Sequence, residues 1–235
     1  MIGSRNVLAV VPARGGSKGI PLKNLIQING KSLIQYVAEV LRELTFIDRS
    51  IVSTDHSGIA TAAKDAGLLV PFTRPNDLSG DLVSDVDVLT HAIHFMEKQD
   101  ELKYDIVVML QPTSPFRKPE HVTEVVLKLV EGQYDSVLTV SETDLKAHPL
   151  KQLLFVDEKL DYYDNRGREI IARQQLEPVF HRNGIAYAMT RDCLLGQRVV
   201  IGKNCSAVLI RGTVVNIDSL EDIQLAEACI ADQVN

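Results

Sequence analysis

Residues 7–24 read VLAVVPARGGSKGIPLKN and decide the fold of this chain. The first six, Val7–Pro12, form a short apolar run, which is typical of a strand buried on both faces of a parallel sheet. The run ends in a turn with three glycines, so the backbone there can approach a ligand closely and turn its N–H groups inward. The stretch therefore predicts a buried strand followed by a ligand-binding loop.

The loop also concentrates positive charge. Arg14, Lys18 and Lys23 place three cations within ten residues, and Ser17 and Asn24 add neutral hydrogen-bond donors. Crowding cations is unfavourable unless an anion binds between them, and a triphosphate would neutralise all three. A solvated basic loop is the alternative, but the place directly after a buried strand favours phosphate binding. The residues match neither the P-loop pattern nor the G-x-G-x-x-G dinucleotide pattern.

Beyond the loop, predicted strands and helices alternate along the chain. This rhythm predicts an α/β fold with a mostly parallel, Rossmann-like sheet and helices on both faces. In such folds ligands bind beyond the carboxyl ends of the strands. The predicted helices are 32–44, 57–66, 85–98, 119–129 and 220–231, and the other predicted strands are 49–53, 68–72, 106–110, 136–140, 185–189, 207–209 and 213–217.

The alternation stops between about residues 142 and 182, where the sequence is polar and irregular. This segment suits an extended hairpin or arm, inserted within a single domain that spans residues 1–235. An arm that leaves a compact domain often serves a partner subunit.

Composition excludes several classes of protein. A net charge of −6 in 235 residues argues against binding to nucleic acid, which needs a basic surface. The three cysteines, Cys193, Cys205 and Cys229, have no metal-ligand spacing and favour a reducing compartment. No apolar run suits a signal peptide or a membrane span. We therefore expect a cytoplasmic protein that binds neither nucleic acid nor membranes.

The glycine loop resembles the signature PAR-x-x-SKG-x-P-x-KN of the CMP–sialic acid synthetases (acylneuraminate cytidylyltransferases), a family that includes legionaminate and pseudaminate cytidylyltransferases. Further stretches along nearly the whole chain are similar to motifs of the same family, in the same order. They are IVSTD at 51–55, Arg74–Pro75, LQPTSPFR at 110–117, HPLK at 148–151, RQQL at 173–176, NG-x-x-Y at 183–187 and NIDSLEDIQLAE at 216–227.

The resemblance implies a nucleotide-diphospho-sugar transferase type of fold with a dimerisation arm. It implies that the protein is an enzyme that transfers CMP from CTP to the anomeric hydroxyl of a nonulosonic (sialic-type) acid and releases pyrophosphate. It also implies a homodimer and a requirement for magnesium.

The same resemblance assigns roles to individual residues. The implied catalytic residues are Arg14, Lys23 and Asp218. The implied CTP contacts are Arg14, Ser17, Lys18, Asn24, Arg74, Gln111, Thr113 and Ser114. The implied contacts to the acidic sugar are Gln111, Arg173, Gln174, Gln175, Asn183 and Tyr187, with Arg173 suited to pair the carboxylate in bidentate fashion.

The chain departs from the family pattern at the metal site. The family has two aspartates on either side of one apolar residue, and side chains two apart on a strand share a face. Here the pair is Asn216 and Asp218, so Asp218 is the leading magnesium ligand and Asn216 a weaker one. Asp222 is expected to serve the N-terminus of the following helix.

Two further departures concern the sugar. Residues 180–183 read FHRN where the family has an arginine, any residue and then NG, so either His181 takes the place of the arginine or Arg182 does its work. Residues 198–201 lack the aromatic side chains that often line the N-acyl pocket in sialic acid enzymes, which leaves the particular nonulosonic acid open.

Three other functions remain as alternatives. A CMP–octulosonate (Kdo) synthetase is one, although that class has Thr-Arg where this chain has Lys18–Gly19. A catalytically weak nucleotide-binding homologue is the second, because of Asn216. A sugar-phosphate nucleotidyltransferase that uses GTP or UTP is the third, since the residues alone do not reveal the base.

Overall fold

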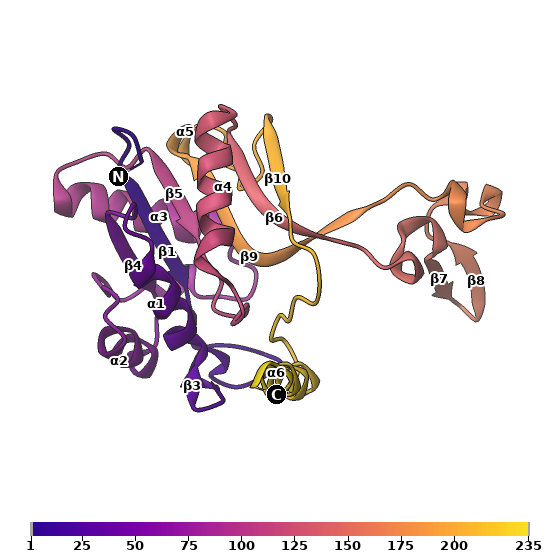
Figure 1. The fold of residues 1–235 in the computed structure, drawn as a ribbon, viewed down its shortest axis with the longest axis horizontal. Coiled ribbons are helices and arrows are strands. Elements are labelled where there is room, and N and C mark those ends of the chain that lie inside the picture. The colour runs from indigo at the N-terminus through magenta and orange to yellow at the C-terminus, as the bar shows by residue number, and fades with distance from the viewer. Residues whose placement is uncertain (1, 235) are drawn as a thin grey trace.

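A computed structural model describes residues 2–234 of the chain. Its centre is a sheet with the strand order β10-β6-β9-β5-β1-β4 (Figure 1). The strands are β1 (Val7–Pro12), β4 (Arg49–Ser53), β5 (Ile106–Met109), β6 (Ser136–Glu142), β9 (Phe180–Thr190) and β10 (Cys205–Leu209). β1 runs parallel to β4 and β5, and β10 runs parallel to β6, whereas β9 is antiparallel to both of its neighbours. The predicted mostly parallel α/β fold is confirmed.

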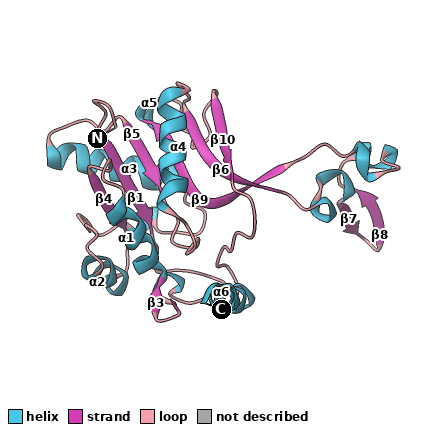
Figure 2. Cartoon of the chain, in the orientation of Figure 1, coloured by secondary structure: helices cyan, strands magenta, loops and turns pink. Residues whose placement is uncertain are grey.

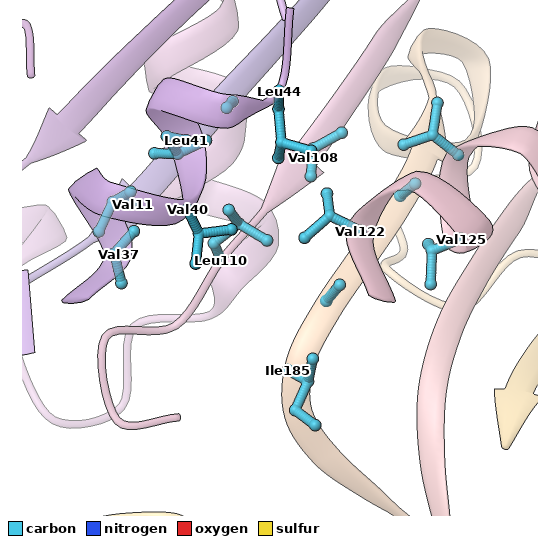
Figure 3. Close-up of a cluster of buried hydrophobic side chains, with 14 of the residues drawn as sticks. Val11, Val37, Val40, Leu41, Leu44, Val108, Leu110, Val122, Val125 and Ile185 are labelled. Atoms are coloured by element: carbon cyan, nitrogen blue, oxygen red, sulfur yellow. The ribbon is translucent and has the colours of Figure 1, made fainter. Parts of the chain in front are cut away.

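Helices cover both faces of this sheet (Figure 2). Successive side chains of a strand point to opposite faces, so β1 divides its residues between two cores. Val7, Ala9 and Val11 face the core formed with α1, α2 and α4, part of which Figure 3 shows. Leu8 and Val10 face the core formed with α3 and α5. The helices are α1 (Leu33–Glu43), α2 (Ser57–Asp65), α3 (Asp85–Asp100), α4 (Pro119–Glu131), α5 (Arg191–Leu195) and α6 (Leu220–Val234).

A third apolar cluster ties the C-terminal segment to the glycine loop. It joins Ile20 and Leu33 to Val215, Ile217 and Ala226, the last of which lies on α6. The short hairpin of β2 (Gln27–Ile28) and β3 (Lys31–Ser32) lies beside it. This packing brings two segments about 200 residues apart in sequence to the same edge of the sheet.

The predicted strands 68–72 and 213–217 are wrong. Leu69 makes only an isolated parallel bridge to Ile51. Residues 213–217 cross the carboxyl edge of the sheet, where the Ile217 N–H donates to the Thr113 carbonyl at 2.8 Å. Their apolar side chains are buried in the third cluster, so the pattern that predicted a strand reflects burial without a strand partner.

Residues 143–179 project far from the sheet between β6 and β9 (Figure 1). The projection contains the antiparallel hairpin of β7 (Leu153–Val156) and β8 (Lys159–Tyr162) and four short 3-10 turns. At its base, Nε2 of the buried His148 lies 3.1 Å from the Glu177 carbonyl, which joins the outgoing and returning chains. The segment has the extended shape expected of an arm, and its role in dimerisation and the single-domain division stay predictions. Within residues 2–234, no helix has the length and apolar character that crossing a membrane requires.

Candidate active site

A cavity of about 510 Å³ lies at the carboxyl ends of β1 and β5, where the fold class predicts a ligand site. Four segments that are distant in sequence supply its walls: the glycine loop, residues 74–88, residues 111–113, and Asn216 with Asp218. The structure thus brings together a large part of the predicted CTP and metal residues. Those that line the cavity are Arg14, Ser17, Lys18, Lys23, Asn24, Arg74, Gln111, Thr113, Asn216 and Asp218.

The glycine loop is held in shape by hydrogen bonds. The Gly15 N–H donates to Asp55 Oδ1 at 2.8 Å, and Nδ2 of the buried Asn24 donates to the Arg14 carbonyl at 3.0 Å. A Cβ added to Gly19 would lie 2.6 Å from the Asp218 carbonyl oxygen, so only glycine allows the loop to pack against residues 217–219. Asn24 therefore braces the loop as well as lining the cavity.

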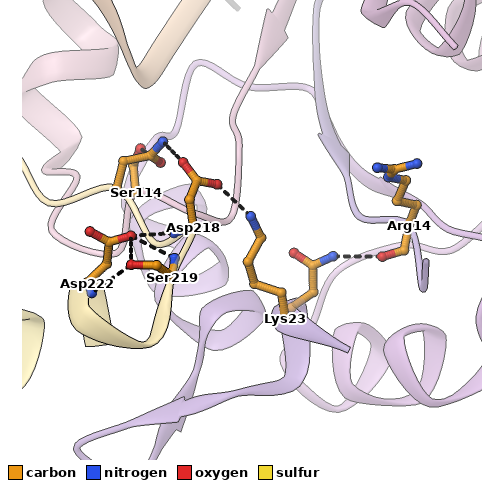
Figure 4. A network of polar contacts seen from close by, with 8 residues as sticks. Arg14, Lys23, Ser114, Asp218, Ser219 and Asp222 are labelled. Carbon is orange, nitrogen blue, oxygen red and sulfur yellow. Dashed lines mark hydrogen bonds and ion pairs between the residues drawn. The ribbon is translucent and has the colours of Figure 1, made fainter. Parts of the chain in front are cut away.

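Each of the three loop cations is paired with a carboxylate. Asp81 accepts from Arg14 Nη1 and Lys18 Nζ, both at 2.7 Å, while Lys23 Nζ lies 2.7 Å from Asp218 Oδ1 (Figure 4). Hydrogen bonds from Lys18 and Arg14 hold the pKa of the Asp81 carboxyl below its ordinary value. The charges of the loop cations are thus better balanced than the sequence suggested, because Asp81 and Asp218 pair with them.

Arg74 is fixed at the end of β4. It is buried, its Nε donates to Ser53 Oγ at 3.0 Å, its Nη2 donates to the Ser53 carbonyl, and its own N–H donates to the Thr54 carbonyl at 2.7 Å. Burial lowers the pKa of Arg74 to about 10. Asp85, the first residue of α3, also lines the cavity; burial raises the pKa of its carboxyl, against the opposing charges of Arg182 and Arg74.

The loop after β5 divides into ligand-facing and supporting residues. Gln111 and Thr113 line the cavity, whereas Ser114 lies behind it, with Oγ donating to the Asn183 carbonyl at 3.3 Å and contacting Asn216 Oδ1 at 3.4 Å. Arg117 attaches this loop to β9. Its buried guanidinium donates to the carbonyls of Ile185, Gln111 and Gly184.

Asn216 and Asp218 lie side by side, although no strand holds them. Asn216 Nδ2 donates to Asp218 Oδ2 at 3.1 Å, and the other Asp218 oxygen faces Lys23. Asp222 Oδ2 accepts from the N–H groups of Asp218 and Ser219 at 2.9 and 2.7 Å, so its predicted role at the N-terminus of α6 is confirmed (Figure 4).

This pair could offer a divalent cation one carboxylate and one amide oxygen, provided that the cation displaces Lys23 and the Asn216 amide nitrogen from the Asp218 oxygens and that Asn216 turns its Oδ1 away from Ser114. Magnesium keeps several waters and binds through one or two carboxylates together with substrate phosphates, so the donor set meets the minimum. Within residues 2–234, no group of three or more His, Cys, Asp or Glu side chains could form a dedicated metal site. A metal here would depend on the phosphates for most of its ligands.

The residues predicted to bind the sugar do not meet in one chain. Arg173, Gln174 and Gln175 form an exposed 3-10 turn on the arm, outside the cavity, and Gln175 Oε1 accepts from the Ile171 and Ala172 N–H groups at 2.8 Å. Within a single chain, Arg173 therefore has no access to the nucleotide cavity.

Asn183 and Tyr187 are buried in β9. Asn183 Oδ1 accepts from Thr139 Oγ1 at 2.6 Å and its Nδ2 donates to Ser141 Oγ at 3.0 Å, while Tyr187 packs in the core beneath α3. Of the two candidates for the family arginine, His181 Nδ1 lies 3.0 Å from Thr143 Oγ1 at the arm base. The charge of Arg182 acts on Asp85 in the cavity. Neither His181 nor Arg182 lines the cavity, so which of them takes the place of the family arginine stays a prediction.

Sequence reasoning missed Asp81, Asp85 and the supporting role of Arg117. Asp81 and Asp85 follow the Arg74–Pro75 motif closely, and Arg117 closes the LQPTSPFR motif. Their positions within or shortly after recognised motifs were the available signal. The contacts of Asp81 with Arg14 and of Arg117 with Ile185 span 67 and 68 residues, so they were not readable from the sequence.

Residues 8–227 match the sequence profile of the family described as Cytidylyltransferase. The chain belongs to the cytidylyltransferase family. It is therefore a nucleotidyltransferase, as the sequence predicted.

Named relatives extend the comparison. The chain is 29% identical to the pseudaminic acid cytidylyltransferase of Campylobacter jejuni over 94% of both chains. It is 32% identical to the CMP-N,N'-diacetyllegionaminic acid synthase of Legionella pneumophila over 90% of both. It is 27% identical to the N-acylneuraminate cytidylyltransferase of Escherichia coli, over 94% of this chain and 51% of that protein. The predicted resemblance to this group of cytidylyltransferases is confirmed.

Solved structures show the same fold at lower identity. The CMP:2-keto-3-deoxy-manno-octonic acid synthetase complexed with CTP superposes with a TM-score of 0.72 at 19% identity, covering 97% of this chain and 99% of that one. The 4-diphosphocytidyl-2C-methyl-D-erythritol synthase of Anaerococcus prevotii superposes with a TM-score of 0.63 at 13% identity. These likenesses show that the nucleotide-sugar transferase type of sheet is shared.

Proposed function

We propose that this cytidylyltransferase transfers CMP from CTP to the anomeric hydroxyl of a nonulosonic acid. The observation that carries the proposal is the convergence of Arg14, Lys18, Lys23 and Arg74 with Asp218 around one cavity at the carboxyl edge of the sheet. The names of the relatives, which concern pseudaminic, legionaminic and neuraminic acids, support this class of acceptor.

In the reaction, the anomeric oxygen forms a bond to the α-phosphorus of CTP, and the bond from that phosphorus to the bridging oxygen breaks. Pyrophosphate leaves with the electron pair, and the hydroxyl proton is released. Because the protein takes no covalent part, catalysis rests on positioning and charge neutralisation. We assign these tasks to Arg14, Lys18 and Lys23, after CTP has displaced Asp81 from the loop cations.

Cytidylyltransferases of this kind generally use a divalent metal, and we propose magnesium, held by Asp218 and Asn216 Oδ1. Bound magnesium would neutralise charge on the phosphates. The protein groups hold the nucleotide in place. Arg74, Gln111 and Thr113 do so from one part of the cavity wall, and Lys23 and Asn24 from another.

We further propose that the acidic sugar meets Arg173, Gln174 and Gln175 from the arm of a second copy, in a homodimer. The arm exposes Leu153, Phe155 and Leu160 on its hairpin at 50%, 69% and 66% of their surface. Apolar side chains gathered on a projecting hairpin are typical of an interaction surface. Because CTP is a nucleotide of the cell interior, we place the reaction in the cytoplasm.

The test is pyrophosphate release from CTP, GTP or UTP, each with pseudaminate, N,N'-diacetyllegionaminate, N-acetylneuraminate or Kdo as acceptor. We expect release with CTP and at least one nine-carbon acid. Release with Kdo alone would establish the octulosonate alternative instead. Absence of release with every pair, from a protein that binds CTP, would contradict the proposal and favour a catalytically weak homologue.

A further inference from the structure

A second cavity, of about 410 Å³, lies behind the loop 111–117, on the side away from the nucleotide cavity. Residues of that loop, the start of α4, β9 and the segment 210–215 enclose it. Its volume falls within the range of pockets that hold small molecules. Among its described lining residues, Ser114 is the one predicted to contact CTP, and the proposed reaction assigns Ser114 no task.

The charged side chains that line this cavity are all basic. Arg117, Lys118 and Arg211 contribute guanidinium or ammonium groups, and among its described lining residues there is no Asp or Glu. His121 adds an imidazole, whose pKa is lowered by burial. Such an enclosure favours an anion, because the low-dielectric walls strengthen the attraction.

Arg117 is the deepest of these cations. It is 5% exposed and has no carboxylate partner. Its Nε and Nη2 donate to three backbone carbonyls, and within residues 2–234 its Nη1 has no hydrogen-bond partner. Burial lowers the pKa of Arg117 to about 9. A buried charge without a counter-charge is unfavourable, so an anion in the cavity would relieve it.

The rest of the cavity wall is apolar. Phe116, Ile185, Ile210 and Val215 lie beside the basic groups. We propose that the cavity binds a small organic anion, with its carboxylate or phosphate at Arg117, Lys118 and Arg211 and a compact apolar body against these four side chains.

Arg117 also connects the two cavities. Its Nη2 donates at 2.6 Å to the carbonyl of Gln111, a residue that lines the nucleotide cavity, and at 3.3 Å to the carbonyl of Gly184. A Cβ at Gly184 would lie 2.9 Å from Gln111 Oε1, so the three residues are in tight contact. An anion that attracts the Arg117 guanidinium changes the hydrogen bond from Arg117 to the Gln111 carbonyl. Binding at the second cavity is therefore coupled to the affinity for CTP.

The site can be tested by calorimetric titration of the full chain with phenyl phosphate and phenylacetate, in the presence of saturating CTP and without an acid acceptor. We expect at least one of the two to bind, and the double variant Lys118→Gln, Arg211→Gln to weaken it about tenfold. The matched control Arg42→Gln, Lys64→Gln, which removes two exposed cations from α1 and α2, should bind as the wild type does. Equal binding of neutral benzyl alcohol, or binding of neither anion, would overturn the assignment.

The coupling has its own measurement. The dissociation constant of CTP, with and without saturating phenyl phosphate, should differ about fivefold or more, and the Lys118→Gln, Arg211→Gln variant should lose that difference while binding CTP normally. An unchanged dissociation constant in the wild type would overturn the coupling. Inorganic phosphate that binds as tightly as phenyl phosphate would overturn the role of the apolar walls.

Discussion

The nucleotide cavity and the arm differ in how far their side chains are buried and hydrogen-bonded within one chain. The cavity collects side chains from four distant segments onto one edge of a rigid sheet, where Arg74 and Asn24 are buried and hydrogen-bonded. The arm leaves the sheet with Leu153, Phe155 and Ile171 exposed, the last at 93%. A single chain therefore gathers most of the residues predicted to bind CTP around one cavity, whereas the predicted sugar residues Arg173, Gln174 and Gln175 lie outside it on the arm.

The largest expected effect comes from a substitution within the nucleotide cavity itself. Replacing Lys23 with Met removes the cation that faces Asp218, and we expect kcat/KM for CTP to fall about 10²- to 10³-fold, the size of effect that follows the loss of one preorganised charge. Steady-state pyrophosphate release measures it. Lys64→Met, which removes an exposed lysine from α2, is the control, and an unchanged kcat/KM for Lys23→Met would exclude a catalytic role.

The arm is tested by Arg173→Ala, which should raise the KM for the acid about ten- to hundredfold through loss of a charged hydrogen bond. CTP binding should not change, because Arg173 lies outside the cavity. If the arm serves a partner, an equimolar mixture of re-assembled Arg173→Ala and Lys23→Met subunits should recover about a quarter of wild-type activity. About half of the dimers then contain one subunit of each kind, and one of the two sites in each of these mixed dimers is intact. No recovery from verified mixed dimers would show that each arm serves its own chain.

Asn216→Asp tests whether Asn216 and Asp218 bind the metal. A second carboxylate beside Asp218 should lower the magnesium concentration for half-maximal activity about tenfold, since the added charge attracts the cation directly. Titration of magnesium in the presence of CTP, followed by both binding and activity, measures it. Gln99→Glu, which adds the same charge at an exposed position on α3, should leave the midpoint unchanged. A rise from near-zero activity would identify the natural chain as a weakened homologue.

The smallest expected effect is on stability. Burial raises the pKa of Asp85, with Arg182 and Arg74 facing it, so the folded state favours the protonated carboxyl. This contribution to stability is complete below the ordinary pKa of 3.8 and is lost as the pH rises through the higher folded value. Asp85→Asn should therefore raise the Tm at pH 7 by about 1–3 °C and leave it nearly unchanged below pH 4. Thermal unfolding at both pH values measures the change, and a lower Tm at pH 7 would contradict it.

The sequence by itself determined the local features. Val7–Pro12 and Arg49–Ser53 are strands with the predicted bounds, and the helix expected from residue 32 begins after Ser32, whose hydroxyl and Gln35 form a capping box. The cation-rich loop and the motif at 110–117 lie at the predicted edge of the sheet. These features follow from periodicity and turn chemistry, which act between near neighbours.

Only the tertiary structure decided how distant segments meet. Periodicity reports that Val215 and Ile217 are buried, but burial in a cluster and burial in a sheet leave the same pattern. The pairing of Asp81 with Arg14 and Lys18, and the hydrogen bonds from Arg117 to the carbonyls of Gly184 and Ile185, depend on contacts across 60 residues or more. The sequence thus determined which groups are predicted to bind phosphate. The packing of the chain decided which carboxylates and carbonyls contact those groups, because electrostatic and hydrogen-bond partners are set by distance in space.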